Sequence, residues 1–322
     1  LDCGVVVIGR NEGERLKACV RSLRMFATIV YVDSGSTDGS VDWARCQGVD
    51  VVELGPEVGF TAARARNAGF RRLRELAPDV TYVQFVDGDC ALNEEWPRNA
   101  VRFLGTHADV CAVFGRRRER HPERSIYNRL CDHEWDVPTG EARAFGGDVM
   151  IRADALESAG GYREDLVAGE EPELCVRLRA AGWSIWRLDH EMTLHDAAMT
   201  RFRQWWLRHV RSGYAFANGA YLHGSGPERM WVWESRRALV WGLLLPMLCA
   251  LAVLIFGWPG LAVLAIYPLQ LIRRARRMPG TGTAQLQFAL FELLSRYPEC
   301  VGQLKFARDR FFRSKRTLIE YK

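Results

Sequence analysis

Two hydrophobic patterns alternate along the first third of the chain. Residues 5–8, 29–32, 49–54 and 80–86 are short and largely apolar, which is typical of strands buried in a parallel sheet. Between them, residues 12–25, 40–47 and 61–76 carry apolar side chains at helical spacing. Because these units are joined by short loops, we expect an α/β fold with a mostly parallel sheet and helices on both faces.

Polar residues gather where three of these predicted strands end. The clusters are Arg10-Asn11-Glu12, Asp33-Ser34-Gly35-Ser36 and Asp87-Gly88-Asp89. In sheets of this kind, ligands bind at the carboxyl ends of the strands. The pattern therefore predicts a ligand site at this edge of the sheet.

The hydrophobic pattern changes after about residue 230. Residues 238–256 contain no charge, a turn-like Gly257-Trp258-Pro259-Gly260 follows, and residues 261–272 form a second, shorter uncharged run. Arginines lie on both outer sides, at 236–237 and at 273–277. This favours a membrane hairpin with both ends on the cytoplasmic side. The second run is short for a crossing, so a re-entrant segment is an alternative, as is a hairpin buried in a soluble core.

Two further segments have an amphipathic pattern. Residues 201–214 place Phe202, Trp206, Val210 and Tyr214 on one helical stripe among arginines, and Leu286, Leu290, Leu293 and Tyr297 repeat it more weakly. Such segments either lie in a membrane interface or pack on the rest of the protein, and the pattern leaves both open.

The overall composition narrows the class of protein. The chain has 322 residues, 48% hydrophobic and 26% charged, with 44 basic and 39 acidic side chains and a net charge of +5. These values exclude a polytopic membrane protein and a disordered chain, and the small positive excess gives no reason to expect a nucleic acid partner. Nine scattered cysteines without a CxxC pair favour a reducing cytosol, and no signal peptide is expected at the start.

Asp87-Gly88-Asp89 is the strongest candidate for chemistry. Two carboxylates at a strand end can bind a hard divalent cation that bridges phosphates and neutralises a leaving diphosphate. The same tripeptide is common in turns, so its position directly after a strand carries the argument.

Six ordered motifs carry a resemblance to a known family. They are residues 5–11, 33–40, 65–69, 87–89, 145–148 and 160–171, the last containing Gly160-Gly161-Tyr162 and Gly169-Glu170-Glu171. Over about residues 4–195 the chain resembles family 2 glycosyltransferases of the GT-A fold, which have a Rossmann-like mixed sheet. The resemblance implies an inverting transfer of a sugar from a nucleotide diphosphate, with Mg²⁺ or Mn²⁺ as cofactor.

The resemblance also assigns nucleotide-binding residues. It implies that Asp33 accepts a hydrogen bond from a uracil-like base, because Ser36-Thr37-Asp38 already supplies the helix cap and leaves Asp33 free. Asn11 and Glu12 would line the nucleotide pocket with the loop around Gly35, although they also suit a helix start. Arg66 would lie near the diphosphate, or else on a solvated helix face.

Glu170 and Glu171 are the candidate catalytic residues. The resemblance places the general base at the second acid of a Gly-Glu-Asp-like element, which corresponds to Glu171, with Glu instead of Asp. Attack by the acceptor hydroxyl requires such a base, and direct displacement gives inversion. The alternative is a pair of ordinary helix-start carboxylates.

Two other features complete the expected site. A histidine late in the domain helps to hold the metal or diphosphate in many GT-A enzymes, and His195 corresponds to it; a structural histidine is the alternative. The run Arg116–Arg120 is interpreted as a solvated loop that flanks the acceptor at most.

These features predict a membrane-associated glycosyltransferase of bacterial type, attached to the inner membrane with its active site in the cytoplasm. Residues 1–228 would form the GT-A domain, 229–277 the membrane hairpin and 278–322 an interfacial tail. The donor would be a UDP- or GDP-sugar and the acceptor a lipid-linked saccharide, in the synthesis of a surface polysaccharide or glycolipid. A polyprenyl-phosphate glycosyltransferase and a non-catalytic nucleotide-binding scaffold are the alternatives.

Overall fold

The computed structural model describes residues 2–278 and 282–312. The chain divides into two compact units, Leu1–Thr200 and Arg201–Lys322, which are described separately below. Parts of the expected interfacial tail, residues 279–281 and 313–322, lie outside the described residues.

The first unit is built on a nine-stranded mixed sheet. Its path has the order β3-β2-β1-β4-β8-β6-β9-β5, and β7 pairs with β9. The strands are β1 (Cys3–Gly9), β2 (Ile29–Asp33), β3 (Asp50–Glu53), β4 (Tyr82–Asp87), β5 (Cys90–Leu92), β6 (Val110–Glu119), β7 (Gly140–Glu141), β8 (Val149–Arg152) and β9 (Ser184–His195). The strands β3, β2, β1 and β4 run parallel, whereas β8 is antiparallel to both of its neighbours. The predicted α/β sheet is confirmed, and its mixed half begins at β8.

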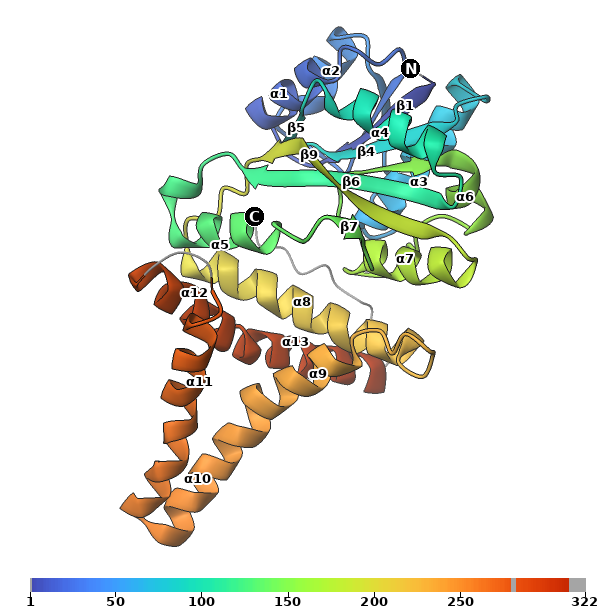
Figure 1. The fold of residues 1–322 in the computed structure, drawn as a ribbon. Coiled ribbons are helices and arrows are strands. Elements are labelled where there is room, and N and C mark those ends of the chain that lie inside the picture. Colours follow the sequence, from blue (N-terminus) through green and yellow to red (C-terminus); the bar gives the residue numbers. More distant parts are fainter. Residues whose placement is uncertain (1, 279–281, 313–322) are drawn as a thin grey trace. The chain divides into compact units, whose positions relative to one another are not determined.

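Helices cover both faces of this sheet (Figure 1). In order they are α1 (Glu14–Ser22), α2 (Ser40–Cys46), α3 (Ala62–Leu76), α4 (Trp96–Thr106), α5 (Ile126–Glu134), α6 (Ala153–Ser158) and α7 (Glu170–Ala180). Helix α4 lies on one side and helices α5 and α7 on the other. Helix α3 packs so closely on β1 that a Cβ added to Gly69 would lie 2.3 Å from Cγ1 of Val6.

Strand β9 is the longest of the sheet and continues to His195. Pairing with β6 and β5 accounts for this length, since Glu119 and Cys90 both lie opposite His195 in the register. The long strand carries its last residues to the edge where β1, β2 and β4 end.

The second unit is helical. It contains α8 (Phe202–His223), α9 (Val232–Leu239), α10 (Leu245–Phe256), α11 (Ile266–Ala275), α12 (Thr283–Leu294) and α13 (Arg296–Phe311). A π-helical turn at Val240–Leu244 joins α9 to α10 without a break, and a 3-10 helix at Trp258–Ala265 leads into α11. Within the described residues, one helix, Val232–Phe256, is long and apolar enough to cross a membrane.

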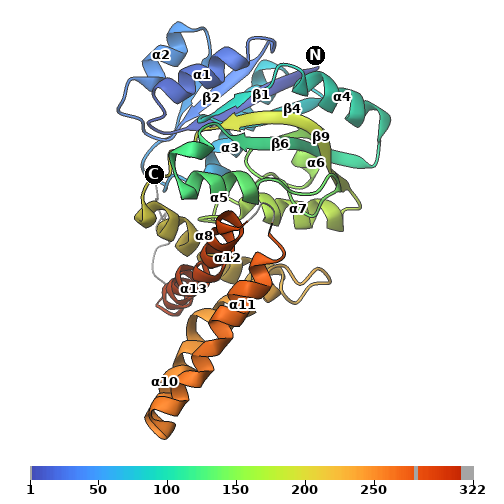
Figure 2. The ribbon, with the colours of Figure 1, turned by 60° about the vertical axis from the view of Figure 1, so that its left-hand side comes forward.

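The predicted apolar runs form the two arms of a helical hairpin (Figure 2). Near the turn the two arms are in such close contact that a Cβ added to Gly260 would lie 2.3 Å from the carbonyl oxygen of Ala252. The outer side chains are widely exposed, with Leu254 at 83% and Trp258 at 85%. These exposed apolar residues are not the core of the described unit, so the alternative of a buried soluble hairpin is not supported.

The amphipathic segment 201–214 lies in α8 and packs against α13. Tyr214 stacks edge-on against Phe306, and a Cβ on Gly302 would lie 2.0 Å from the carbonyl oxygen of Val210. Val210 and Tyr214 are therefore buried between helices, and only Phe202 of the predicted stripe is widely exposed. On α12, Leu286 and Leu290 are exposed and Leu293 is buried.

Candidate active site

The loops after β1 and β2 are bonded to each other at the edge where the parallel strands end. The amide of Asn11 donates to Oγ of Ser36 at 2.8 Å, and the amide of Thr37 donates to Oδ1 of Asn11 at 2.8 Å. Asn11 adopts a left-handed backbone conformation (φ 55°), which Asn tolerates better than most residues. The expectation that these polar clusters lie together is confirmed.

Asp33 is committed to its own loop. Its carboxylate accepts hydrogen bonds from the Tyr31 hydroxyl, the Gly35 amide, and both the amide and hydroxyl of Ser36, and the residue is 1% exposed. The premise that Asp33 is left free is therefore wrong, because Tyr31 of β2 supplies one donor and Gly35 and Ser36 of the loop supply three. Asp38 does cap the next helix, through the Ser40 amide. Base binding by Asp33 remains a prediction.

Arg66 lies at the centre of a cluster of acidic side chains. Its guanidinium is 3.0 Å from Oδ1 of Asp87, 2.9 Å from Oε1 of Glu170 and 3.2 Å from Oε1 of Glu171. Arg66 is only 2% exposed, which excludes the solvated helix face as its environment. One buried guanidinium thus joins the end of β4 to the start of α7.

Glu171 and Glu170 begin helix α7 as predicted, but their environments differ. The Glu170 side chain is buried, and the Glu171 side chain is mostly buried, with 16% of it exposed. Burial, reinforced by repulsion from Glu170 and opposed by Arg66, raises the pKa of Glu171 to about 7. A carboxyl that titrates near neutral pH is suited to accept a proton during catalysis.

A second arginine, Arg117, completes the cluster and was missed in the sequence. Its Nη2 lies 2.8 Å from Oδ2 of Asp148 and 3.3 Å from Oδ2 of Asp87. Asp148 also accepts from the amide of Asp87 at 2.9 Å and from Oγ1 of Thr193 at 2.7 Å. The interpretation of 116–120 as a solvated loop is wrong, because Arg116, Arg117, Arg118 and Glu119 belong to β6. Register shifts beside Arg116 and Arg117 break the alternation of this strand, so the sequence pattern gave no signal for Arg117.

Asp89 and His195 form a second group beside this cluster. Oδ2 of Asp89 is 3.3 Å from Nε2 of His195, whose Nδ1 is 3.8 Å from Oε2 of Glu119. The ring of Trp135 packs edge-on against His195 and lies under the guanidinium of Arg117. Trp135 therefore links the Asp89 group to the Arg117 cluster.

The donor atoms around Asp89 suit a divalent cation. Asp89, Cys90 and His195 bring potential ligand atoms within 4.8 Å of one another, as do Asp87, Cys90 and Asp148. Burial, with the negative charge of Asp148, raises the pKa of Cys90 far above its usual range, so its thiol stays protonated. The carboxylate and imidazole atoms remain, and they are ligands that Mn²⁺ accepts.

Two glycines allow the motifs to approach each other. A Cβ on Gly147 would lie 2.3 Å from Oδ2 of Asp87, so only glycine fits beside the carboxylate. Gly161 has a positive φ of 70°, and the next residue, Tyr162, exchanges two backbone hydrogen bonds with the Asn67 side chain. The six motifs of the sequence therefore include residues that hold the acidic cluster in place.

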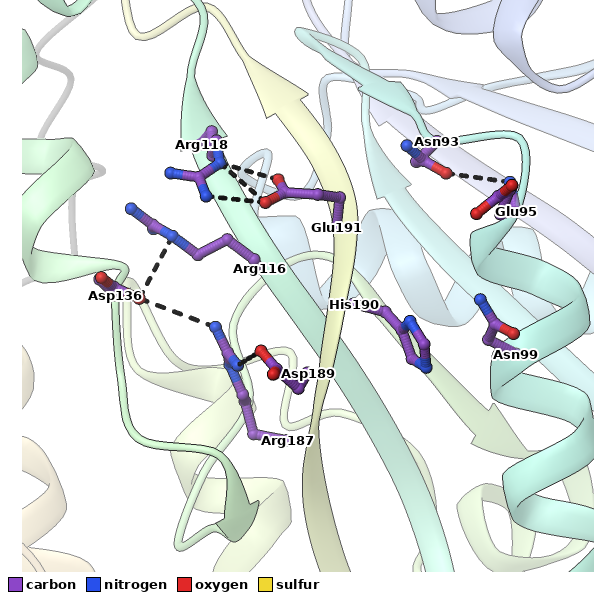
Figure 3. A pocket seen from close by; sticks show the side chains of 10 residues that line it. All are labelled: Asn93, Glu95, Asn99, Arg116, Arg118, Asp136, Arg187, Asp189, His190 and Glu191. Atoms are coloured by element: carbon purple, nitrogen blue, oxygen red, sulfur yellow. Dashed lines mark hydrogen bonds and ion pairs between the residues drawn. The ribbon is translucent and has the colours of Figure 1, made fainter.

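A separate polar cavity of about 390 Å³ opens between β6, β9 and the start of α4 (Figure 3). Arg118 pairs there with Glu191, while Arg116 and Arg187 both reach Asp136. Arg118 follows Arg117 directly along β6, and Glu191 lies two residues before Thr193 along β9. The arginines of this cavity thus find their counter-charges within it.

Part of the chain matches a known protein family. Residues 4–153 match the family model described as Glycosyl transferase family 2. The succinoglycan biosynthesis protein ExoA of Rhizobium meliloti is 26% identical over 203 residues, which are 58% of this chain and 60% of ExoA. The chain thus matches about three fifths of the length of that relative.

Two solved structures share the fold. The mannosyltransferase PcManGT from Pyrobaculum calidifontis, in complex with GDP-Man and Mn²⁺, has a TM-score of 0.64 at 19% identity, covering 93% of this chain and 86% of its own. The fragment 1–349 of S. aureus TarS, in complex with UDP-GlcNAc, has a TM-score of 0.50 at 14% identity, covering 96% and 92%. Residues 4–153 therefore form a family 2 glycosyltransferase domain, and the sheet has the GT-A fold, as the motifs predicted.

Proposed function

We propose that the protein is an inverting glycosyltransferase that transfers a sugar from a UDP- or GDP-sugar to a lipid-linked saccharide at a membrane. The observation that carries this proposal is Glu171, a carboxyl with a pKa of about 7 that shares Arg66 with Asp87 at the strand end. Solved neighbours with GDP-Man or UDP-GlcNAc bound support a nucleotide-sugar donor.

Glu171 acts as the general base in this proposal. It takes the proton of the acceptor hydroxyl while the hydroxyl oxygen bonds to the anomeric carbon of the donor. The bond from that carbon to the phosphate oxygen breaks, and its electron pair leaves with the nucleoside diphosphate. Because no enzyme nucleophile takes part, this single displacement inverts the anomeric configuration.

The other acidic residues bind and orient in this proposal. Asp87, Asp89 and His195 would hold Mg²⁺ or Mn²⁺, and the bound cation would supply neutralising charge for the departing diphosphate. Arg66 fixes the positions of Asp87 and Glu171 through its two contacts. The loops containing Asn11, Glu12, Asp33 and Gly35 lie at the same sheet edge, where they line the nucleotide pocket.

The C-terminal hairpin anchors the enzyme in the membrane. The uncharged helical stretch 238–256 rises about 28 Å at 1.5 Å per residue, close to the ~30 Å of a hydrocarbon core. The second arm is shorter in sequence, but its 3-10 helix Trp258–Ala265 rises about 2 Å per residue, so residues 258–272 reach about 26 Å. The arms are therefore nearly matched in length, which favours a full crossing over a re-entrant segment.

Anchoring places the enzyme where a lipid-linked acceptor lies. In this proposal the arginine flanks keep both hairpin ends on the cytoplasmic side of the inner membrane. Residues 1–228 act as the catalytic domain, 229–277 as the hairpin, and 278–322 as an interfacial tail. The exposed Leu286 and Leu290 of α12 are consistent with such a tail.

A donor screen on the detergent-purified full chain tests this function. We expect one nucleotide sugar to raise the melting temperature and to be turned over with Mn²⁺ but not with a chelator, because a ligand of the native state stabilises it. Binding without any turnover would favour the non-catalytic scaffold. Absence of both binding and turnover with UDP- and GDP-sugars would contradict the proposal.

A further inference from the structure

A cavity of about 480 Å³ lies in the second unit. Figure 1 shows the two arms of the hairpin diverging toward α9 and α12, the helices that contribute to its lining. Its walls come from α9 and the start of the apolar helix on one side, and from α11 and α12 on the other. Five of its lining residues are arginines: Arg236, Arg237, Arg273, Arg274 and Arg277. The two arginine clusters that flank the apolar runs in the sequence therefore form one site.

This cavity has much more positive than negative charge. Its single carboxylate is Glu292, which pairs with Arg274 and also lies 3.3 Å from Arg296 outside the cavity. The other four arginines of the cavity make no ion pair with any residue within 2–278 or 282–312. Several cations in one cavity repel each other, so the site favours a bound anion.

Unpaired donors point to the same conclusion. Among the described residues, no hydrogen-bond acceptor is available to the buried Nε of Arg237 or to that of Arg274. A guanidinium fork matches the oxygens of a phosphate better than those of a halide, because it donates two parallel hydrogen bonds. The cavity thus offers several guanidinium groups to one anion that has several oxygen atoms.

The position of the cavity indicates where that anion comes from. Val240 and Trp241 line it, and the exposed apolar side chains Leu244, Met247 and Leu248 follow directly along the helix. Trp233, also in the lining, is widely exposed. Tryptophans and arginines at the end of an apolar helix are typical of the headgroup level of a bilayer.

We propose that this arginine cavity binds the phosphate of an anionic membrane lipid, whose acyl chains lie along the exposed apolar side of the hairpin. The proposal rests on the membrane insertion proposed above, but it does not depend on sugar transfer. Bound lipid supplies a negative charge to the four arginines of the cavity that make no ion pair with the described residues. Phosphate is common to lipid and free anions, and the adjoining apolar surface favours the lipid.

Binding of short-chain lipids to the detergent-purified full chain tests the proposal. The probes are dioctanoyl phosphatidic acid, dioctanoyl phosphatidylcholine and inorganic pyrophosphate. Binding is followed by the change in tryptophan fluorescence, to which Trp233 and Trp241 of the lining contribute. We expect saturable binding of phosphatidic acid at least about tenfold tighter than of either other probe, since only it combines charge with acyl chains. Equal binding of pyrophosphate would overturn the lipid assignment, and equal binding of phosphatidylcholine would overturn the charge requirement.

Neighbouring arginines provide a matched pair of variants. Arg277→Gln removes a lining residue, whereas Arg276→Gln removes the same charge from an exposed residue outside the lining. We expect Arg277→Gln to weaken phosphatidic acid binding about tenfold, the usual effect of losing one charge-assisted hydrogen bond, and Arg276→Gln to change it less than about twofold. Equal weakening by both would show diffuse attraction and overturn the cavity.

The same samples separate this inference from the proposed function. Glu171→Gln should keep lipid binding whatever it does to transfer, because Glu171 lies in the other unit. Loss of transfer with lipid binding kept would concern the catalytic proposal alone. A wild-type protein that transfers sugar but does not bind phosphatidic acid selectively would overturn the lipid site alone.

Discussion

Arg66 and Glu171 are joined by an ion pair of 3.2 Å between helix α3 and the start of helix α7. The same guanidinium holds Glu170 and Asp87, so it divides one positive charge among three carboxylates. This sharing leaves Glu171 incompletely neutralised, and its burial then raises its pKa to about 7. The ion pair thus connects the position of the base to its protonation.

Arg66→Lys tests this shared contact. A lysine ammonium cannot replace the fork of a guanidinium, so at least one buried carboxylate loses a partner. We expect a loss of roughly 1–3 kcal/mol in the free energy of unfolding and an acidic limb of the transfer rate that moves to higher pH. Arg71→Lys, on an exposed face of the same helix, is the control. If both variants melt and titrate like the wild type, Arg66 does not hold the site.

Gly147→Ala tests how closely β8 and the end of β4 must approach. The new methyl group would lie 2.3 Å from Oδ2 of Asp87, so the carboxylate has to move. We expect transfer to fall by at least about tenfold, because a shift of about 1 Å near the chemistry is costly. In Gly146→Ala the methyl group meets nothing within 4 Å, and activity should stay within about twofold of wild type. Equal rates for the two variants would contradict the assigned geometry.

Asp89→Asn tests the cation site. An amide replaces a charged ligand, so we expect the Mn²⁺ concentration for half-maximal transfer to rise about tenfold or more. Melting curves report whether the buried contact with His195 survives the change. Asp79→Asn, at an exposed position of the same unit, is the control and should leave the Mn²⁺ dependence unchanged. A wild-type Mn²⁺ response in Asp89→Asn would remove Asp89 from the site.

Much of the fold follows from the sequence because its signals are local. Strand β4 and Asp87-Gly88-Asp89 are adjacent in the chain, and Gly169-Glu170-Glu171 stands at the start of α7. The family resemblance carried by this short motif was therefore sufficient to choose Glu171 as the candidate base. The paired apolar runs of the hairpin are equally local.

The remaining parts of the site depend on contacts between distant segments. Arg117 is a site residue because β6 pairs with β9 and so places it beside Asp148, 31 residues later in the chain. A run of arginines contains no information on which side chain faces inward. In the same way, only the folded loop shows that Asp33 is surrounded by its own donors.

Replacement of Met247 and Leu248 by Arg tests the membrane hairpin. Both are exposed apolar residues of α10 at the middle of the stretch 238–256, and an arginine at the bilayer centre costs about 2.5–3.5 kcal/mol. We expect the double variant to be lost from the carbonate-washed membrane fraction that retains the wild type. Val58→Arg, at an exposed apolar position in the first unit, should remain with the membrane. Two results would contradict a crossing. One is wild-type protein that is soluble without detergent, and the other is protease cleavage near Trp258 only from the cytoplasmic side.

Glu171 also makes a prediction about stability. Its folded pKa of about 7 lies above the ordinary 4.5, so the native state binds this proton more tightly than the unfolded state. The stabilisation from the proton is complete below pH 4.5 and is lost as the pH rises to about 7. Glu171→Gln should therefore gain about 1–3 kcal/mol in unfolding free energy relative to wild type across this window. A constant difference between the two proteins would contradict the raised pKa.

The pH dependence of kcat/KM for the donor, measured on wild type, Glu171→Gln and Glu170→Gln, tests the central claim most directly. We predict an acidic limb near pH 7 in the wild type, which reports the base of the free enzyme. Glu171→Gln should lose that limb and slow transfer by about 10²–10⁴-fold while donor and Mn²⁺ still bind, because the lost interaction belongs to the transition state. A fall of less than about threefold in Glu171→Gln, with the limb kept and Glu170→Gln inactive, would contradict the assignment of Glu171 as the base.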